Sequence, residues 1–183
     1  MNDVAKTQIN EVGTPDKKIS RQNLIDFEEL LKNENGAFVG DTANCPLKHS
    51  FSDGIYVREI TIPAGMLIVG KIHKHDHPNF LLKGEVIVFT ESNGEEHLKA
   101  PCSMISEGGT KRALYSITEL VWTTVHCNPT NTRDMKELEK IVIADSFEEY
   151  EKFLLKEKSV KNRLKSFIIK KLSTCFACIP QFE

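Results

Sequence analysis

The chain lacks the long apolar segments of a membrane protein. Apolar runs such as Met66 to Val69 extend over only about four residues, whereas a membrane-spanning helix needs roughly 18. The first residues are polar and contain no apolar core of a secretion signal. We therefore expect a cytoplasmic protein without a transmembrane segment.

Cysteine and net charge are also scarce. Five cysteines, an odd number, are scattered over 183 residues, which argues against a disulfide framework and favours reduced thiols. The net charge is −2, so the composition contains no strong signal for a nucleic-acid partner. The length suits one domain with appendages.

The common catalytic signatures are missing. The sequence contains no G-x-S-x-G, no P-loop, no G-x-G-x-x-G and no H-E-x-x-H pattern. Hydrolases with a nucleophile elbow, nucleotide-binding enzymes of the usual kinds and zinc proteases are therefore not indicated.

Residues 37–128 have the texture of a β protein. Short runs of β-branched and aromatic residues alternate with Gly, Pro and Asn. One strand is predicted over Ile55–Ile62, another from Met66 to about His75, and a hairpin turn at 92–94. Strands this short and closely spaced predict a sandwich or barrel. Further strands are predicted at 80–82, 85–89, 103–106, 111–117 and 120–126.

Helical patterns flank this region on both sides. Residues 1–36 form an arm followed by a helix that Ser20 can cap, predicted from about 21 to 33. Residues 129–183 form a helical extension. A short helix is predicted to start at Thr132 or Asp134 and to run through Glu139, and a second is opened by a capping box at Ser146.

A third helix is predicted over 159–172, with apolar residues on one face. Eight Lys and Arg stand against two Glu between residues 150 and 172. Such a helix usually packs on its own domain or on a partner subunit. A membrane surface or a nucleic-acid contact is the alternative.

Histidines form the densest chemical feature of the sequence. His73, His75 and His77 alternate, so on an extended strand their imidazoles share a face. Trp122, Thr124 and His126 alternate in the same way. Because neutral imidazole is the commonest ligand for divalent transition metals, His73, His75, His77 and His126 form a candidate metal site. Two alternatives remain. The segment from His73 to His77 could be an exposed polar turn, and His126 could be a core residue.

The glycines around these histidines make the chain resemble the cupin superfamily. The first cupin motif, G-x5-H-x-H-x3-E-x6-G, has its spacing reproduced from Gly65 to Gly84 through His73. Lys71 stands in the place of the first histidine and His77 in the place of the glutamate.

The second cupin motif, G-x5-P-x-G-x2-H-x3-N, is reproduced in spacing from Pro101. Only Gly109 matches in identity, and Arg112 stands where the last histidine ligand belongs. The resemblance implies a double-stranded β-helix, a small barrel that is mainly β, with helical extensions at both ends. It also implies a divalent transition metal (Zn, Ni, Mn or Fe), a small-molecule ligand and a homodimer.

A closer resemblance connects the chain to small cupin-like proteins encoded by bacteriophages. It is based on the segment from Cys45 to Gly65, on Gly70 to Lys74, on Gly109 to Arg112 and on Trp122 to His126. This implies a bacteriophage source and the cytoplasm of the host cell.

The cations at the ligand positions change the expected chemistry. Lys71 and Arg112 cannot ligate a metal, and strand parity predicts that both face the barrel interior, where they would bind an anionic group. A buried Arg112 needs a carboxylate or a ligand beside it. The candidate ligand-binding residues are Lys71, Arg112, Tyr115, Trp122 and Arg58, and the candidate internal partners of Arg112 are Glu59, Glu85 and Glu107.

Two functions remain open. One is a metal-binding protein that holds a small anionic ligand in the barrel mouth, with metal-dependent activity on it. The other is a non-catalytic bacteriophage protein that sequesters a ligand or takes part in assembly, in which the metal site is degenerate.

Overall fold

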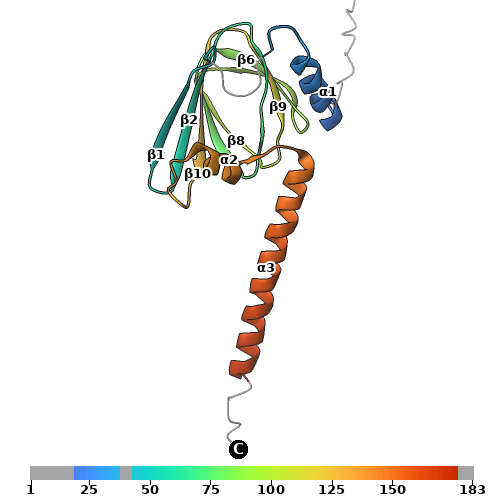
Figure 1. Ribbon diagram of the computed structural model, residues 1–183, viewed down its shortest axis with the longest axis vertical. Helices are drawn as coiled ribbons and strands as arrows, with labels where there is room; N and C mark the ends of the chain where they lie inside the picture. Colours follow the sequence, from blue (N-terminus) through green and yellow to red (C-terminus); the bar gives the residue numbers. More distant parts are fainter. Residues whose placement is uncertain (1–18, 38–42, 177–183) are drawn as a thin grey trace, which may run out of the picture.

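The computed structural model describes residues 19–37 and 43–176, with side chains as far as Ile169 (Figure 1). Two antiparallel sheets face each other and form a barrel. The five-stranded sheet has the order β1 (Leu47–Ser52), β2 (Ile55–Ile62), β10 (Leu120–Cys127), β5 (His77–Lys83) and β8 (Cys102–Ser106). The four-stranded sheet has the order β3 (Leu67–Val69), β9 (Arg112–Ser116), β6 (Glu85–Thr90) and β7 (Gly94–Lys99).

The strand pairs are nested in the sequence. Strand β2 pairs with β10, β3 with β9, β5 with β8, and β6 with β7. The outermost pair therefore joins the two ends of the barrel segment, and the innermost pair is a hairpin. An antiparallel ribbon nested and wound in this way is a double-stranded β-helix, so the predicted fold is confirmed.

The core lies between the two sheets at one end of the barrel. It contains Leu81, Leu120 and Trp122 from the five-stranded sheet and Val86 and Val88 from the four-stranded sheet. Each follows the period of two that places alternate residues on one face of a strand. Toward the other end of the barrel the inward positions become polar.

A small third sheet joins the barrel to the C-terminal extension. It pairs β4 (Ile72–His73) with β11 (Ile143–Ala144). Helix α2 (Met135–Val142) precedes β11 and buries Leu138 and Val142. It is capped by Asp134, one of the two predicted starts, and extends beyond the predicted end at Glu139. Because His73 lies opposite Ile143, the extension helps to position the histidine run.

The prediction of one strand from Met66 to His75 is wrong. The structure divides the segment into β3 and β4, with Gly70 and Lys71 in neither strand. The two short strands belong to different sheets, β3 beside β9 and β4 beside β11. The break between them changes which side chains face the interior.

Helix α1 (Arg21–Lys32) is confirmed, with the predicted cap at Ser20, which forms a capping box with Asn23. It packs beside the start of β9, where its Glu28 carboxylate lies 2.9 Å from the buried Lys111 ammonium. The arm before residue 19 lies outside the described residues.

Helix α3 (Phe147–Phe176) starts after Ser146, whose hydroxyl accepts a hydrogen bond from the Glu149 amide as the predicted capping box requires. The two helices predicted after Ser146 are one continuous helix, because no Gly or Pro interrupts residues 147–176. The helix leaves the barrel and projects away from it (Figure 1). Within the described residues, no helix is both long enough and apolar enough to span a membrane.

Candidate metal centre

Two of the histidines come from neighbouring strands of the five-stranded sheet. His77 begins β5 and His126 lies near the end of β10. These strands are antiparallel and pair Asn79 with Thr124, so two residues further along His77 and His126 meet on the inward face. Their ring centroids are 4.7 Å apart.

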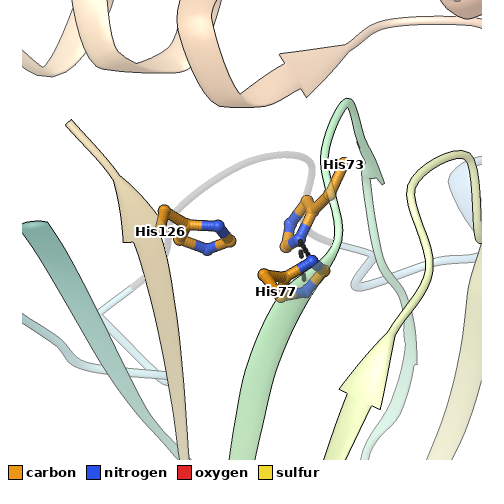
Figure 2. Close-up of side chains that lie close together, drawn as sticks. All are labelled: His73, His77 and His126. Carbon is orange, nitrogen blue, oxygen red and sulfur yellow. Dashed lines mark hydrogen bonds between the residues drawn. The ribbon is translucent and has the colours of Figure 1, made fainter. Parts of the chain in front are cut away.

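The third histidine, His73, comes from β4. Its strand is held by the pairing with β11, and its carbonyl accepts a hydrogen bond of 2.8 Å from the Gly109 amide. Nδ1 of His73 lies 2.7 Å from Nε2 of His77. Figure 2 shows the three rings pointing toward one another from three separate strands.

The three imidazoles form a group in which one nitrogen from each ring lies within 4.8 Å of the others. For comparison, a metal–nitrogen bond of about 2.0–2.1 Å at a tetrahedral ion places two ligand nitrogens roughly 3.4 Å apart. His77 and His126 are 4% and 6% exposed. The spacing and the donor chemistry therefore suit a divalent transition metal, with a further position left for another ligand.

Burial keeps these histidines neutral. Desolvation lowers the pKa of His73 to about 2, helped by the nearby His77, His126, Arg112 and Arg58. Desolvation also lowers the pKa of His126 to about 3 and lowers that of His77. At neutral pH all three rings keep the nitrogen lone pairs that metal ligation requires.

Hydrogen bonds select which nitrogen of each ring carries the proton. Nδ1 of His77 donates to the carbonyl of His75 at 3.1 Å, which leaves Nε2 with its lone pair. The Thr124 hydroxyl donates to the Arg58 carbonyl and so accepts from Nε2 of His126, at 3.1 Å. His126 therefore presents Nδ1 as its free lone pair.

Arg112 lies on the inward face of β9, as expected. Its guanidinium donates to the Ser106 hydroxyl and lies 5.4 Å from the centroid of the Trp122 indole. Nε of Arg112 is buried and has no hydrogen-bond partner. Desolvation lowers the pKa of this guanidinium, while Glu96 acts in the opposite direction.

In the part of the chain that the structure describes, no carboxylate forms an ion pair with Arg112. Of the expected partners, Glu85 pairs with Lys99 and Glu59 with Lys48. Neither balances the charge of Arg112, and its Nε–H has no acceptor among the described residues.

The remaining candidates inside the barrel are Arg58 and Trp122. Arg58 alternates with Tyr56 and Ile60 on the inward face of β2, directly opposite Thr124, and its charge lowers the pKa of His73 and His126. Trp122 is 4% exposed and donates to Asn79 at 3.0 Å. Trp122 thus forms the floor on which Arg112 lies.

His75 does not join the other histidines. Residues 74–76 form a bend between β4 and β5, so the alternation that governs a strand does not extend across them. The His75 ring instead meets the Phe153 ring edge-on at 5.1 Å, on α3 and outside the cluster.

The expectation that Lys71 faces the interior is wrong. Lys71 precedes β4 and belongs to no strand, so strand parity does not apply to it. Its ammonium forms an ion pair with Glu139 of α2, with about half of the side chain exposed. One of the two cations expected beside the histidines is therefore absent from the interior.

Tyr115 also lies outside the site. On β9 the inward positions are Arg112, Leu114 and Ser116, so Tyr115 faces outward and is 38% exposed. Tyr115 follows Arg112 by three residues, so on one strand the two side chains face opposite sides. The expected position of Tyr115 beside the ligand is therefore wrong.

Two polar residues of the site were missed. Asn79 is fully buried and donates to the His77 carbonyl at 3.1 Å and to the Ser106 hydroxyl at 2.9 Å. Ser106 in turn accepts from Arg112. The signal for Asn79 was present in the sequence, because it follows His77 by two residues and so shares its face of the strand.

Comparisons with known proteins return structures but no sequence relatives. No protein-family model matches the chain, and none of the curated proteins matches it. Ectoine synthase from P. lautus aligns with a TM-score of 0.42 at 14% identity, over 47% of this chain and 65% of that one, less than two thirds of its length.

Two cupins align with this chain at similar TM-scores and sequence identities. A cupin superfamily protein from Desulfitobacterium hafniense has a TM-score of 0.41 at 10% identity, over 50% of this chain and 84% of that one. An RmlC-like cupin from Methanocaldococcus jannaschii has a TM-score of 0.41 at 16% identity, over 56% and 92%. The nested strand order, rather than these likenesses, establishes the fold of this chain.

Proposed function

We propose that this protein binds one divalent transition metal ion, Zn, Ni, Mn or Fe, through His73, His77 and His126. The observation that carries the proposal is the convergence of three buried, neutral imidazoles with nitrogens within 4.8 Å. Such a donor set suits these metals, and a fourth position stays open for a ligand.

We propose further that the ligand is a small anion held by Arg112. The guanidinium is buried, lacks a carboxylate among the described residues, and has an unused Nε–H. Charge repulsion from Arg112 acts on the histidines and would act equally on a metal cation. An anion lying between the cation and Arg112 offsets that repulsion, so metal and anion favour each other's binding.

The metal, when bound, supplies Lewis-acid chemistry toward a ligand in the open position. The protein residues bind and orient: Arg112 holds the anionic group, and Asn79 and Ser106 fix Arg112 over Trp122. Trp122, on which Arg112 lies, also belongs to the hydrophobic core, so the proposed anion site borders the core on that side.

The second candidate is a non-catalytic protein that sequesters an anion without a metal. It is favoured by one observation, the two arginines Arg112 and Arg58 whose charges act on His73. The bacteriophage source and the host-cell cytoplasm remain part of this proposal.

Elemental analysis of the full chain, purified without added metal, separates the two candidates. The proposed function predicts close to one equivalent of a transition metal, lost in the double variant His73→Ala/His77→Ala and kept in His75→Ala, since His75 lies outside the cluster. A metal-free wild-type chain that takes up no metal on titration would leave only the anion-binding candidate.

A further inference from the structure

Among the residues that the structure describes, the contacts of helix α3 with the barrel lie at its beginning. Phe147 is buried, the Tyr150 ring lies against Gly109, and the Phe153 ring meets His75. Beyond these turns the helix projects into solvent (Figure 1), and the side chains from Lys158 to Ile169 are all exposed. The distal half therefore cannot be explained by packing on its own barrel.

The distal half carries an apolar stripe, defined here as Val160, Leu164, Phe167 and Ile168. These residues are three or four positions apart, so they share one face of the helix. They are 55%, 59%, 61% and 48% exposed. A contiguous apolar strip on an exposed helix indicates a binding surface.

Cations border the apolar stripe on both edges. Successive residues of an α-helix are rotated by 100° about its axis. This rotation places Lys161 and Lys165 along one edge of the apolar stripe, and Lys156 and Arg163 along the other edge. No acidic residue occurs between Lys158 and Ile169. Glu157, just before this segment, forms an i,i+4 ion pair with Lys161 at 3.7 Å, so one of the four edge cations has an acidic neighbour. The strong positive charge is local, because the chain as a whole has a net charge of −2.

The sign of both edges decides against a second copy of this helix. A parallel pair brings opposite edges together, and an antiparallel pair brings like edges together. Since both edges are positive, either arrangement places Lys and Arg against Lys and Arg, which is unfavourable. The same pattern attracts an anionic surface that offers an apolar layer beneath its charges.

We propose that the distal half of α3 binds the surface of an anionic lipid membrane, lying in the plane of the interface. The apolar stripe enters the boundary between headgroups and acyl chains, and the bordering Lys and Arg side chains extend to the phosphates. Each Lys or Arg side chain close to the surface is attracted by the anionic lipids, and this attraction strengthens binding. The barrel, with its candidate metal centre, is thereby held at the membrane.

Vesicle co-sedimentation of the full chain tests this directly. We expect binding to phosphatidylcholine vesicles containing phosphatidylserine, little binding to phosphatidylcholine alone, and weakening as salt is raised. The matched variants are Leu164→Glu and Leu155→Glu. The two leucines are nine residues apart and so lie on opposite faces, with exposures of 59% and 67%.

Leu164→Glu should weaken vesicle binding by about tenfold or more, because it places a charge in the acyl boundary, while Leu155→Glu should weaken it less than about threefold. Far-UV circular dichroism checks that α3 stays helical in both variants. Should Leu164→Glu lose helicity, Lys161→Gln/Lys165→Gln replaces it, with severalfold weaker binding expected.

Four results would overturn the proposal. They are no binding to the anionic vesicles, equal weakening by Leu164→Glu and Leu155→Glu, a lipid-free wild-type dimer that Leu164→Glu dissociates, and binding to duplex DNA in place of vesicles. The third would assign the stripe to a second copy and the fourth would assign the cations to nucleic acid.

Discussion

His73 and His77 are joined by a contact of 2.7 Å between Nδ1 of the first and Nε2 of the second, while His75, between them in the chain, turns away toward Phe153. The bend at residues 74 and 75 interrupts the alternation between β4 and β5, so His75 does not share a face with the other two. A metal ion held by both rings would take the place of this contact between the two nitrogens.

Acid should destabilise the metal-free chain below pH 6.5. The unfolded histidines titrate near 6.5, whereas burial lowers the folded-state pKa of His73 to about 2 and of His126 to about 3. Between pH 6.5 and these low pKa values, the unfolded state binds more protons than the folded state. The folded chain therefore has its full stability above pH 6.5 and loses stability as the pH falls below that value. The slope is about 1.4 kcal/mol per pH unit for each histidine.

Urea unfolding at several pH values measures this slope. His126→Asn should lower this slope by about 1.4 kcal/mol per pH unit, the contribution of one histidine. Stability of the metal-free chain that stays constant between pH 7 and pH 5 would contradict the neutral, buried state of the cluster.

Arg112→Leu should weaken the binding of a small anion, with little change in fold. The lost charge-assisted hydrogen bond corresponds to about 1.5–3 kcal/mol of binding free energy. Inorganic phosphate, titrated calorimetrically into the metal-loaded chain, is the probe. Lys71→Leu is the matched control, because Lys71 pairs with Glu139 outside the barrel. Equal losses of phosphate affinity in both variants would refute the role given to Arg112.

Glu28→Gln should destabilise the chain by about 1–2 kcal/mol, since it leaves the buried ammonium of Lys111 without its carboxylate. Glu29→Gln is the control, because that side chain is 62% exposed and pairs with the exposed Lys32. Denaturant unfolding compares the two variants. If they have the same free energy of unfolding, α1 is not anchored through Lys111.

The homodimer expected from the sequence should use the outer face of β5 and β8. Phe80, Leu82 and Ile105 are 37%, 52% and 65% exposed there, on an edge of the five-stranded sheet. Ile105→Glu should yield monomers in analytical ultracentrifugation, and Leu67→Glu, on the other sheet, should not. A monomeric wild-type chain at micromolar concentration would count against this interface.

The barrel could be predicted because its strands carry local signals. The alternating pattern of Ile55–Ile62 and the turn at 92–94 correspond to β2 and to the β6–β7 hairpin. The continuity of α3 was missed because its capping box and its amphipathic stretch look like separate helices, although nothing in between breaks the helix.

The inward or outward position of a candidate residue was predicted correctly only where the residue lies within a regular strand. His77, His126, Arg112 and Trp122 follow strand parity and face the interior. Lys71 and His75 lie at a break and in a bend, where parity has no meaning. Their positions depend on Glu139 and Phe153, two residues of the C-terminal extension far along the chain, and no local pattern contains that information.

Titration of the metal-free full chain with Zn²⁺ tests the central claim most directly, through His126. This histidine stands outside both cupin motifs and is brought to His73 and His77 only by the pairing of β10 with β5. The account predicts one Zn²⁺ per chain, with affinity reduced at least about a hundredfold in His126→Ala and unchanged in His75→Ala. Undiminished binding in His126→Ala, or a comparable loss in His75→Ala, would contradict it.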